Sequence, residues 1–181
     1  MGLSINHHFP EGVWLPMKRI LVATVFLALS VPFRVAGQDR SSQLKDFTRV
    51  LQVADGLQLS IVHLNDKTVL VLFQPPTLYS IRAHAREATM FYVQGTPQKD
   101  VSLDTAGFTV QQGGESFPST PLNIKHFEKG KVSKGDQIDG MLQLARQIDV
   151  TRPFTVLHGK DSADFRFSDN QVKAMSSPPA K

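Results

Sequence analysis

Apolar and polar residues alternate with a period of two over much of the chain after residue 56. Leu57, Leu59 and Ile61 alternate with polar residues, and Phe165 and Phe167 repeat the pattern near the C-terminus. A period of two places successive side chains on opposite faces of a strand. Turn residues interrupt the pattern about every ten positions, which is typical of short antiparallel strands. The chain is therefore predicted to be all-β, an antiparallel immunoglobulin-like sandwich of about eight strands.

Several segments carry this pattern or a short apolar run. Strands are expected at 57–61, 68–73, 79–85, 90–93, 101–103, 108–110, 122–126, 138–145, 154–157 and 165–167. The first two would form a hairpin around Asn65-Asp66, and Pro75-Pro76 would end the second because proline cannot donate to a ladder. Residues 137–148 also fit a helix, but the alternation of Leu142 and Leu144 favours a strand.

The N-terminal part of the chain has the features of a secretory signal peptide. Met17-Lys18-Arg19 is cationic, residues 20–30 are apolar, and Val35-Ala36-Gly37 offers small residues at a cleavage site. The apolar run is about half of the roughly 20 residues that span a bilayer. We predict that residues 17–37 are removed by cleavage before Gln38. An uncleaved membrane anchor is the alternative.

The signal peptide divides the chain into segments. Residues 1–16 precede Met17 and are interpreted as an upstream extension that is not native. After cleavage, 38–56 would be an N-terminal lead-in with a short helix or turn, because Leu44, Phe47, Val50 and Leu51 have helical spacing. Residues 57–168 would form the sandwich, and the polar segment 169–181 would be a disordered tail.

Composition narrows the functional classes. The 181 residues are 41% hydrophobic and 20% charged, which is typical of a globular protein, and none is cysteine. Disulfides, cysteine-ligated metals and a thiol nucleophile are excluded. The net charge of +4 falls to about +2 without residues 1–37, so nucleic acid is not an expected partner. No transmembrane span is expected after processing.

One predicted strand carries a basic face. Arg82, His84 and Arg86 alternate with apolar residues in the segment 79–85 and just beyond it. On a strand their side chains would lie about 7 Å apart on one face. Such a face suits an anionic ligand such as a carboxylate, a phosphate or an acidic glycan. A solvated outer face of the sheet is the alternative interpretation.

Four lysines gather in a predicted loop. Lys125, Lys129, Lys131 and Lys134 lie within ten residues of one another. A basic loop of this kind can contact anionic lipid headgroups or glycans. A solvated turn accounts for the same pattern.

Histidines and paired acids are the remaining candidates for chemistry. His63, His84, His126 and His158 could bind copper or zinc, but no two have the spacing that places both rings on one strand or helix face. A site would need the fold to bring them together, and scattered surface histidines are the favoured interpretation. Pairs such as Asp136 with Asp139 and Asp161 with Asp164 could serve a glycan hydrolase, but aspartate is also common in turns. No serine-hydrolase, phosphate-loop or zinc-protease motif is present in the sequence.

A set of motifs in the C-terminal half is similar to a known architecture. The motifs are Asp104-x-x-x-Phe108-x-Val110, Lys134-Gly135 before Gly140-x-Leu142-x-Leu144, Phe154-x-Val156 and Phe165-x-Phe167. Over roughly residues 57–168 the chain resembles exported bacterial immunoglobulin-like sandwich domains of secreted antigens and lipoproteins. That resemblance implies a scaffold and no shared catalytic residues. The Cys–Trp–Cys core of antibody domains is missing here.

The expected function follows from export and from the missing catalytic motifs. We expect a periplasmic or secreted protein of the cell envelope that is a non-enzymatic binding or interaction module without a cofactor. Its partner would be a protein or an anionic ligand of the envelope. A histidine-based metal-binding protein is the first alternative, and a glycan hydrolase is the second.

Overall fold

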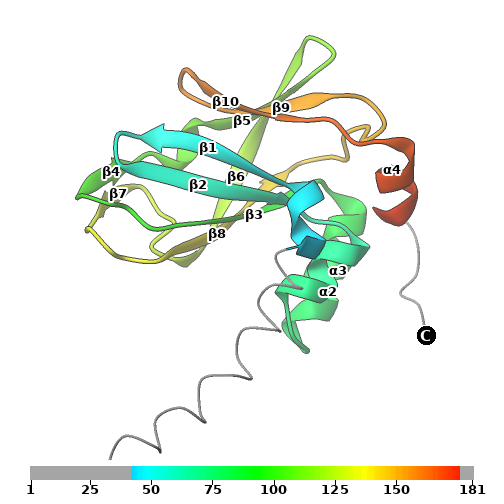
Figure 1. Cartoon of the computed structure of the whole chain (residues 1–181), viewed down its shortest axis with the longest axis horizontal. Helices are drawn as coiled ribbons and strands as arrows, with labels where there is room; N and C mark the ends of the chain where they lie inside the picture. The colour runs from blue at the N-terminus through cyan, green and yellow to red at the C-terminus, as the bar shows by residue number, and fades with distance from the viewer. Residues whose placement is uncertain (1–41, 176–181) are drawn as a thin grey trace, which may run out of the picture. The chain divides into compact units, whose positions relative to one another are not determined.

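The computed structural model describes residues 42–175, and eight strands of this part join in one curled antiparallel sheet (Figure 1). The strands are β1 (Thr48–Ala54), β2 (Leu57–His63), β3 (Met90–Gly95), β4 (Val101–Leu103), β5 (Phe108–Gln112), β6 (Glu115–Lys125), β7 (Gly130–Val132), β8 (Ile138–Leu144), β9 (Phe154–His158) and β10 (Asp161–Phe165). The helices are η1 (Lys45–Phe47), α2 (Asp66–Leu72), α3 (Thr77–Glu87), η2 (Thr105–Gly107) and α4 (Asp169–Met175).

The large sheet has the order β1-β2-β3-β8-β6-β5-β9-β10, while β4 and β7 form a separate pair. The sheet curls until its two end strands approach each other. Arg49 Nε on β1 donates to the carbonyl oxygen of Asp164 on β10 at 3.0 Å, and its guanidinium lies over the Phe165 ring. The all-β, antiparallel prediction is confirmed. The immunoglobulin-like sandwich is not confirmed, because the eight strands of the large sheet form one continuous, nearly barrel-shaped sheet.

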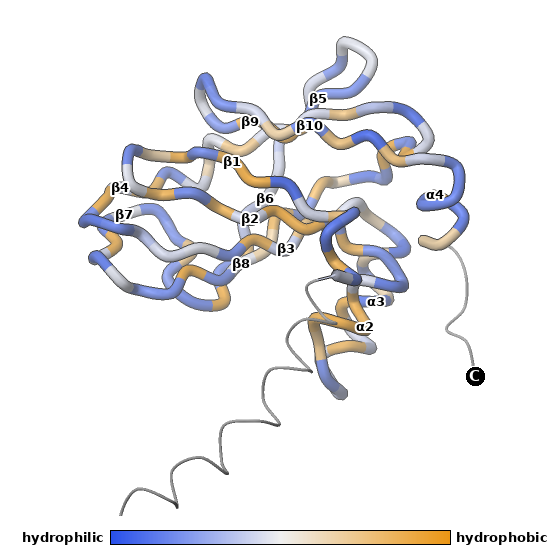
Figure 2. The backbone as a smooth tube through the Cα atoms, in the orientation of Figure 1, coloured by the Kyte–Doolittle hydropathy of each residue, from blue (hydrophilic) through white to orange (hydrophobic). Residues whose placement is uncertain are grey.

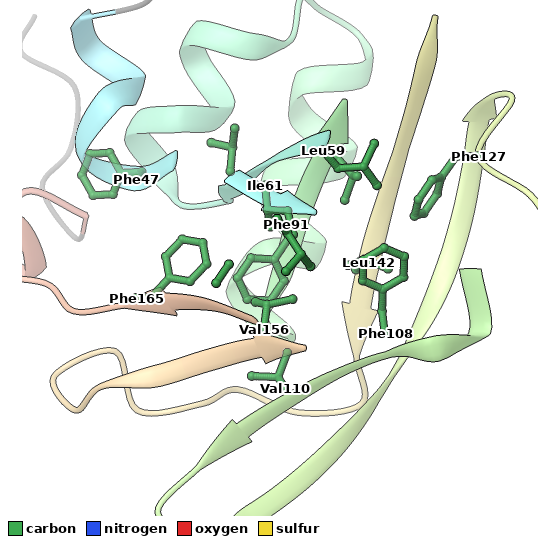
Figure 3. Packing of buried hydrophobic residues seen from close by; sticks show 14 of the residues in the cluster. Phe47, Leu59, Ile61, Phe91, Phe108, Val110, Phe127, Leu142, Val156 and Phe165 are labelled. Carbon is green, nitrogen blue, oxygen red and sulfur yellow. The ribbon is translucent and has the colours of Figure 1, made fainter. Parts of the chain in front are cut away.

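The inward side chains of this sheet form the main core (Figure 3). Phenylalanines dominate it, and the rings of Phe154 and Phe165 stack with centroids 5.0 Å apart. Burying a side chain of this size stabilises a fold by about 1.5–3 kcal/mol. The alternation in the sequence therefore predicted the correct inward positions on most strands.

The ambiguous segment 137–148 contains a strand, as favoured from the sequence: β8 pairs with β3 on one side and with β6 on the other. Gly140 of β8 cannot easily be replaced by another residue type. The Phe127 side chain lies where a Cβ atom on Gly140 would be, so the two cannot coexist without movement.

Two predicted strands are helices. The segment 68–73 lies mainly in α2, and 79–85 lies in α3, so the expected hairpin after β2 does not form. Asn65 is the N-cap of α2: its side chain accepts hydrogen bonds from the backbone N–H groups of Lys67 and Thr68. In α3, Leu78 and Ile81 are buried while Tyr79 is 65% exposed. This spacing of three is helical, whereas the predicted period of two was carried by Tyr79, Ile81, Ala83 and Ala85.

Helices α2 and α3 pack on the outer face of the sheet. Val69, Leu78 and Ile81 form a second apolar cluster with Met90 at the start of β3. Figure 2 shows the hydrophobic residues of α2 beside this end of the sheet. Among residues 42–175, no helix has the length and apolar character needed to cross a membrane.

The predicted segment boundaries need two corrections. The lead-in 38–56 contains β1, and its helical part is limited to a short turn that includes η1. The predicted disordered tail begins with α4, whose Met175 is buried against the main core. The predicted extension 1–16, signal peptide 17–37 and final residues 176–181 lie outside the described residues.

Candidate functional site

A pocket of about 390 Å³ opens where β2 ends and α3 approaches the β8–β9 connection. Its walls come from five parts of the chain: the end of β2 with the segment into α2, the end of α3, the residue before β3, the β8–β9 connection and α4. The lining residues are His63, Leu64, Asn65, Asp66, Ala85, Arg86, Thr89, Gln147, Val150 and Met175. Polar groups and an apolar wall therefore meet in one cavity.

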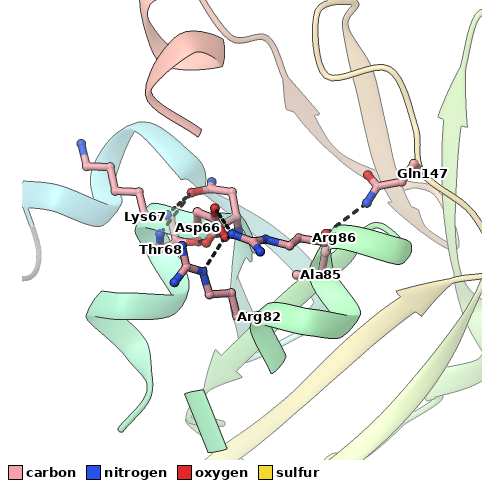
Figure 4. A network of polar contacts seen from close by, with 8 residues as sticks. Asp66, Lys67, Thr68, Arg82, Ala85, Arg86 and Gln147 are labelled. Atoms are coloured by element: carbon pink, nitrogen blue, oxygen red, sulfur yellow. Dashed lines mark hydrogen bonds and ion pairs between the residues drawn. The ribbon is translucent and has the colours of Figure 1, made fainter. Parts of the chain in front are cut away.

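Two arginines hold one carboxylate at the edge of this pocket (Figure 4). Arg82 Nε donates to Asp66 Oδ1 at 2.8 Å, and Arg86 Nη2 donates to Asp66 Oδ2 at 2.8 Å. The hydrogen bond from Arg82, followed by that from Arg86, lowers the pKa of Asp66 to about 2. Asp66 is thus ionised at neutral pH, and the three side chains together carry one positive charge.

The helical conformation of α3 decides which predicted residues meet. Arg82 and Arg86 are four residues apart, so both reach the same side of the helix. His84 points elsewhere: it is exposed, and its Nδ1 lies 2.8 Å from the carbonyl oxygen of Ser80. The predicted basic face is therefore wrong as a strand face, and the structure brings together its two arginines without the histidine.

His63 closes the inner end of the pocket. It is 5% exposed and lies among the rings of Phe91, Phe154 and Phe167, with centroids 5.5–6.0 Å away. Its Nδ1 is buried without a hydrogen-bond partner. Burial lowers the pKa of His63 from 6.5 to about 4, so the ring is neutral at neutral pH. It presents an aromatic, uncharged wall.

The β8–β9 connection is fastened to the helical side of the pocket. Gln147 Nε2 donates to the carbonyl oxygen of Ala85 at 3.1 Å, and the Ile148 N–H donates to Thr89 Oγ1 at 2.9 Å. Sequence reasoning missed Asp66, Gln147 and Met175 as site residues. Only Asp66 had a local signal, since it follows an asparagine with N-cap chemistry.

The four lysines lie apart from this pocket. Lys125 ends β6, Lys131 lies in β7, and Lys129 and Lys134 lie in the adjoining connections, all of them exposed. None of them lines the pocket. The structure places them on and around a loop, as expected, and gives no further sign of a ligand.

The four histidines considered as metal ligands are distributed over the fold. His63 lies in the core, His84 on α3, His126 after β6, and His158 at the end of β9 beside Phe108. In the described part of the chain, no three histidine, aspartate or glutamate residues form a group that could hold a metal ion.

Three of the four paired acids have structural partners. Tyr92 Oη donates to the buried Asp139 at 2.6 Å, and desolvation followed by this hydrogen bond raises the pKa of Tyr92. Asp136 accepts from the Ser133 N–H at 3.1 Å, and Asp164 accepts from Thr155 Oγ1 at 2.7 Å. These three acids therefore act in a turn and between strands.

Comparisons of this chain with protein-family models, with curated proteins and with solved structures found no match.

Proposed function

We propose that this protein is a binding module of the cell envelope that takes a small anion with an apolar body. The observation that carries the proposal is the pocket that joins the exposed Arg86 guanidinium to an apolar wall. A carboxylate or a comparable anion would meet the cationic edge. Its apolar part would lie against Leu64, Val150 and the uncharged ring of His63.

Arg86 has hydrogen-bond donors that could bind a ligand. Its Nε and Nη2 donate to Asp66, while its Nη1 makes no hydrogen bond within residues 42–175. The side chain is 62% exposed, whereas that of Arg82 is 23% exposed and does not line the pocket. Arg82 thus positions Asp66, and Arg86 offers free donors to an anion.

A ligand titration tests this proposal. Benzoate and octanoate should raise the melting temperature of the protein and bind saturably, while the uncharged benzyl alcohol should not. Arg86→Ala should weaken carboxylate binding about tenfold or more, because a hydrogen bond to a charged group is worth about 1.5–3 kcal/mol. Isothermal calorimetry measures the affinity.

Arg166→Ala is the matched control for the loss of one positive charge, since Arg166 is exposed and does not line the pocket. It should leave the affinity for benzoate unchanged. Equal affinities of the wild type and Arg86→Ala, or the absence of saturable binding by both carboxylates, would overturn the proposal.

Export is part of this proposal and is supported by the sequence of residues 17–37. Expression of the full chain in a Gram-negative host should yield a periplasmic product whose mass corresponds to an N-terminus at Gln38. Intact-mass spectrometry of the periplasmic fraction checks this. A product that retains residues 17–37 and stays with the membranes would support the uncleaved anchor instead.

The resemblance to exported immunoglobulin-like domains implies a scaffold and names no ligand, because a fold does not by itself determine a function. In this protein the proposed ligand site lies outside the strand pattern that carries the resemblance. It depends on α2, α3 and α4, which stand beside the sheet.

A further inference from the structure

A second concave surface lies on the outer face of β1, β2 and β3, near the β1–β2 turn. It consists of two adjoining hollows of about 910 and 390 Å³. Gln58, Ser60 and Thr96 line both, so the hollows form one surface. In Figure 1 the β1–β2 turn lies at the opposite end of these strands from α2 and α3, so these two helices do not cover this part of the face.

The side chains on this surface are mainly neutral amides and hydroxyls. We call it the glutamine face and define it by Gln58, Ser60, Gln94, Thr96, Gln98 and Gln137. Within residues 42–175, none of these six side chains makes a hydrogen bond to another side chain or to the backbone. A side-chain amide offers two hydrogen-bond donors and an acceptor, and a hydroxyl group offers a donor and an acceptor. The face therefore has donors and acceptors that are not used within the protein.

The strand register sets the spacing of these groups. Ser60 on β2 is paired with Gln94 on β3 and with Val50 on β1, and Gln58 is paired with Gln52. Neighbouring strands lie about 4.8 Å apart, and every second residue along a strand advances by about 7 Å. Gln58, Ser60 and Gln94 therefore form a regular lattice on the sheet, and Thr96, Gln98 and Gln137 lie in the connections beside it.

Charges stand at the rim of this surface. Asp55 is paired with Lys99, and Lys160 and Asp161 are adjacent residues of opposite sign. A surface without net charge has no preference for an anion or a cation. It also has no tryptophan, tyrosine or arginine, which are the residues enriched where proteins bind proteins most tightly.

We propose that the glutamine face binds a neutral oligosaccharide, whose hydroxyl groups would exchange hydrogen bonds with the amides of the lattice. A sugar hydroxyl donates and accepts, as the unused groups on this face do. The exposed side chain of Val50, at the edge of the larger hollow, would contact an apolar patch of a sugar ring. This site is separate from the anion pocket and does not depend on it.

Side-chain amide resonances of the ¹⁵N-labelled protein test the proposal directly. Chitohexaose and maltohexaose, added separately to about 10 mM, would saturate a site even with a Kd of 1 mM. At least one of them should shift the amide signals of Gln58, Gln94 and Gln137 in a saturable manner. Unchanged signals with both sugars would overturn the proposal.

A double variant tests whether Gln58 and Gln94 contribute to sugar binding. Gln58→Glu with Gln94→Glu keeps the shape of the face, replaces two donors by charged acceptors, and should weaken sugar binding about tenfold. Gln111→Glu, at an exposed position on the distant β5, is the matched control and should bind like the wild type. Arg86→Ala should also keep sugar binding, which distinguishes this site from the anion pocket. Equal sugar affinity of the double variant and the wild type would contradict the assignment.

Discussion

Replacing His63 by phenylalanine is expected to remove most of the loss of stability that the wild type suffers between pH about 6.5 and about 4. His63 is buried among three phenylalanine rings and has an unpartnered Nδ1. A fourth phenylalanine ring has no polar atom to leave unpaired. The variant should fold and be at least as stable as the wild type at mildly acidic pH.

The decrease in the stability of the wild type at acidic pH follows from proton linkage. Burial lowers the pKa of His63 in the folded protein to about 4, while the unfolded chain keeps a value of 6.5. Below pH 6.5 the unfolded state binds a proton that the folded state does not, so the stability of the fold decreases until the folded histidine is also protonated. A difference of 2.5 pH units corresponds to about 3 kcal/mol.

Asp66 affects the stability of the fold in a lower range of pH than His63 does. The hydrogen bonds from Arg82 and Arg86 lower its pKa from 3.8 to about 2, so its contribution to stability is present above 3.8 and is lost as the pH falls towards 2. Asp66 and Arg86 line the same pocket as His63. The effect of His63 can therefore be measured above the range in which this carboxylate titrates.

Urea unfolding at pH about 7 and about 4.5 gives the free energies for the wild type and His63→Phe. The wild type should lose about 2–3 kcal/mol more than the variant over this interval. His84→Gln, which removes an exposed histidine on α3, should retain the loss seen in the wild type. Parallel pH profiles for the wild type and His63→Phe would show that His63 is not the responsible group.

Gly140→Ala is expected to destabilise the fold by about 3 kcal/mol, although it adds a single methyl group. A Cβ atom on Gly140 would overlap the base of the Phe127 ring, which is fully buried and packs against Phe108. The ring cannot turn away easily, because the Phe127 backbone N–H donates to Asn123 at 2.9 Å and fixes the chain there. Moving the ring out of its buried position would cost part of the free energy of unfolding that is lost when a buried phenylalanine is removed. That loss is about 3–5 kcal/mol.

A double-mutant cycle separates this clash from other effects. In a Phe127→Ala background, the additional Gly140→Ala substitution should cost less than in the wild type, since the two ring atoms nearest the added methyl group are removed and only the Cβ atom of residue 127 still has to move. Urea unfolding of the four proteins gives the coupling energy. If Gly140→Ala costs the same in both backgrounds, the Phe127 ring is not the reason that β8 requires glycine at this position.

The site could be predicted from the sequence only in part. Arg82 and Arg86 stood out by charge, and their spacing of four places them on one face both of the strand that was predicted and of the helix that the structure shows. The partner Asp66 was predicted to lie in a turn. The contribution of Gln147 could not be foreseen, because it depends on the β8–β9 connection reaching α3.

The error at α2 and α3 has a definite physical cause. Short apolar segments fit a period of two and a period of three to four almost equally well, and the environment decides between them. Asn65 with Thr68 forms a capping box that starts a helix, and this was the overlooked local signal. The alanine, leucine, arginine and glutamate residues of α3 are also good helix formers.

By itself, the sequence determined that this protein has an antiparallel β fold, because the alternation of apolar side chains requires one face of each strand to be buried. It also determined the absence of thiol chemistry and the positions of most strands from β2 onward. Only the tertiary structure decided that the sheet curls into one continuous surface, that two apolar segments become helices, and that His63 and Arg86 line the same pocket. These features arise from contacts between residues distant in the sequence, and a local pattern of side chains does not encode such distances.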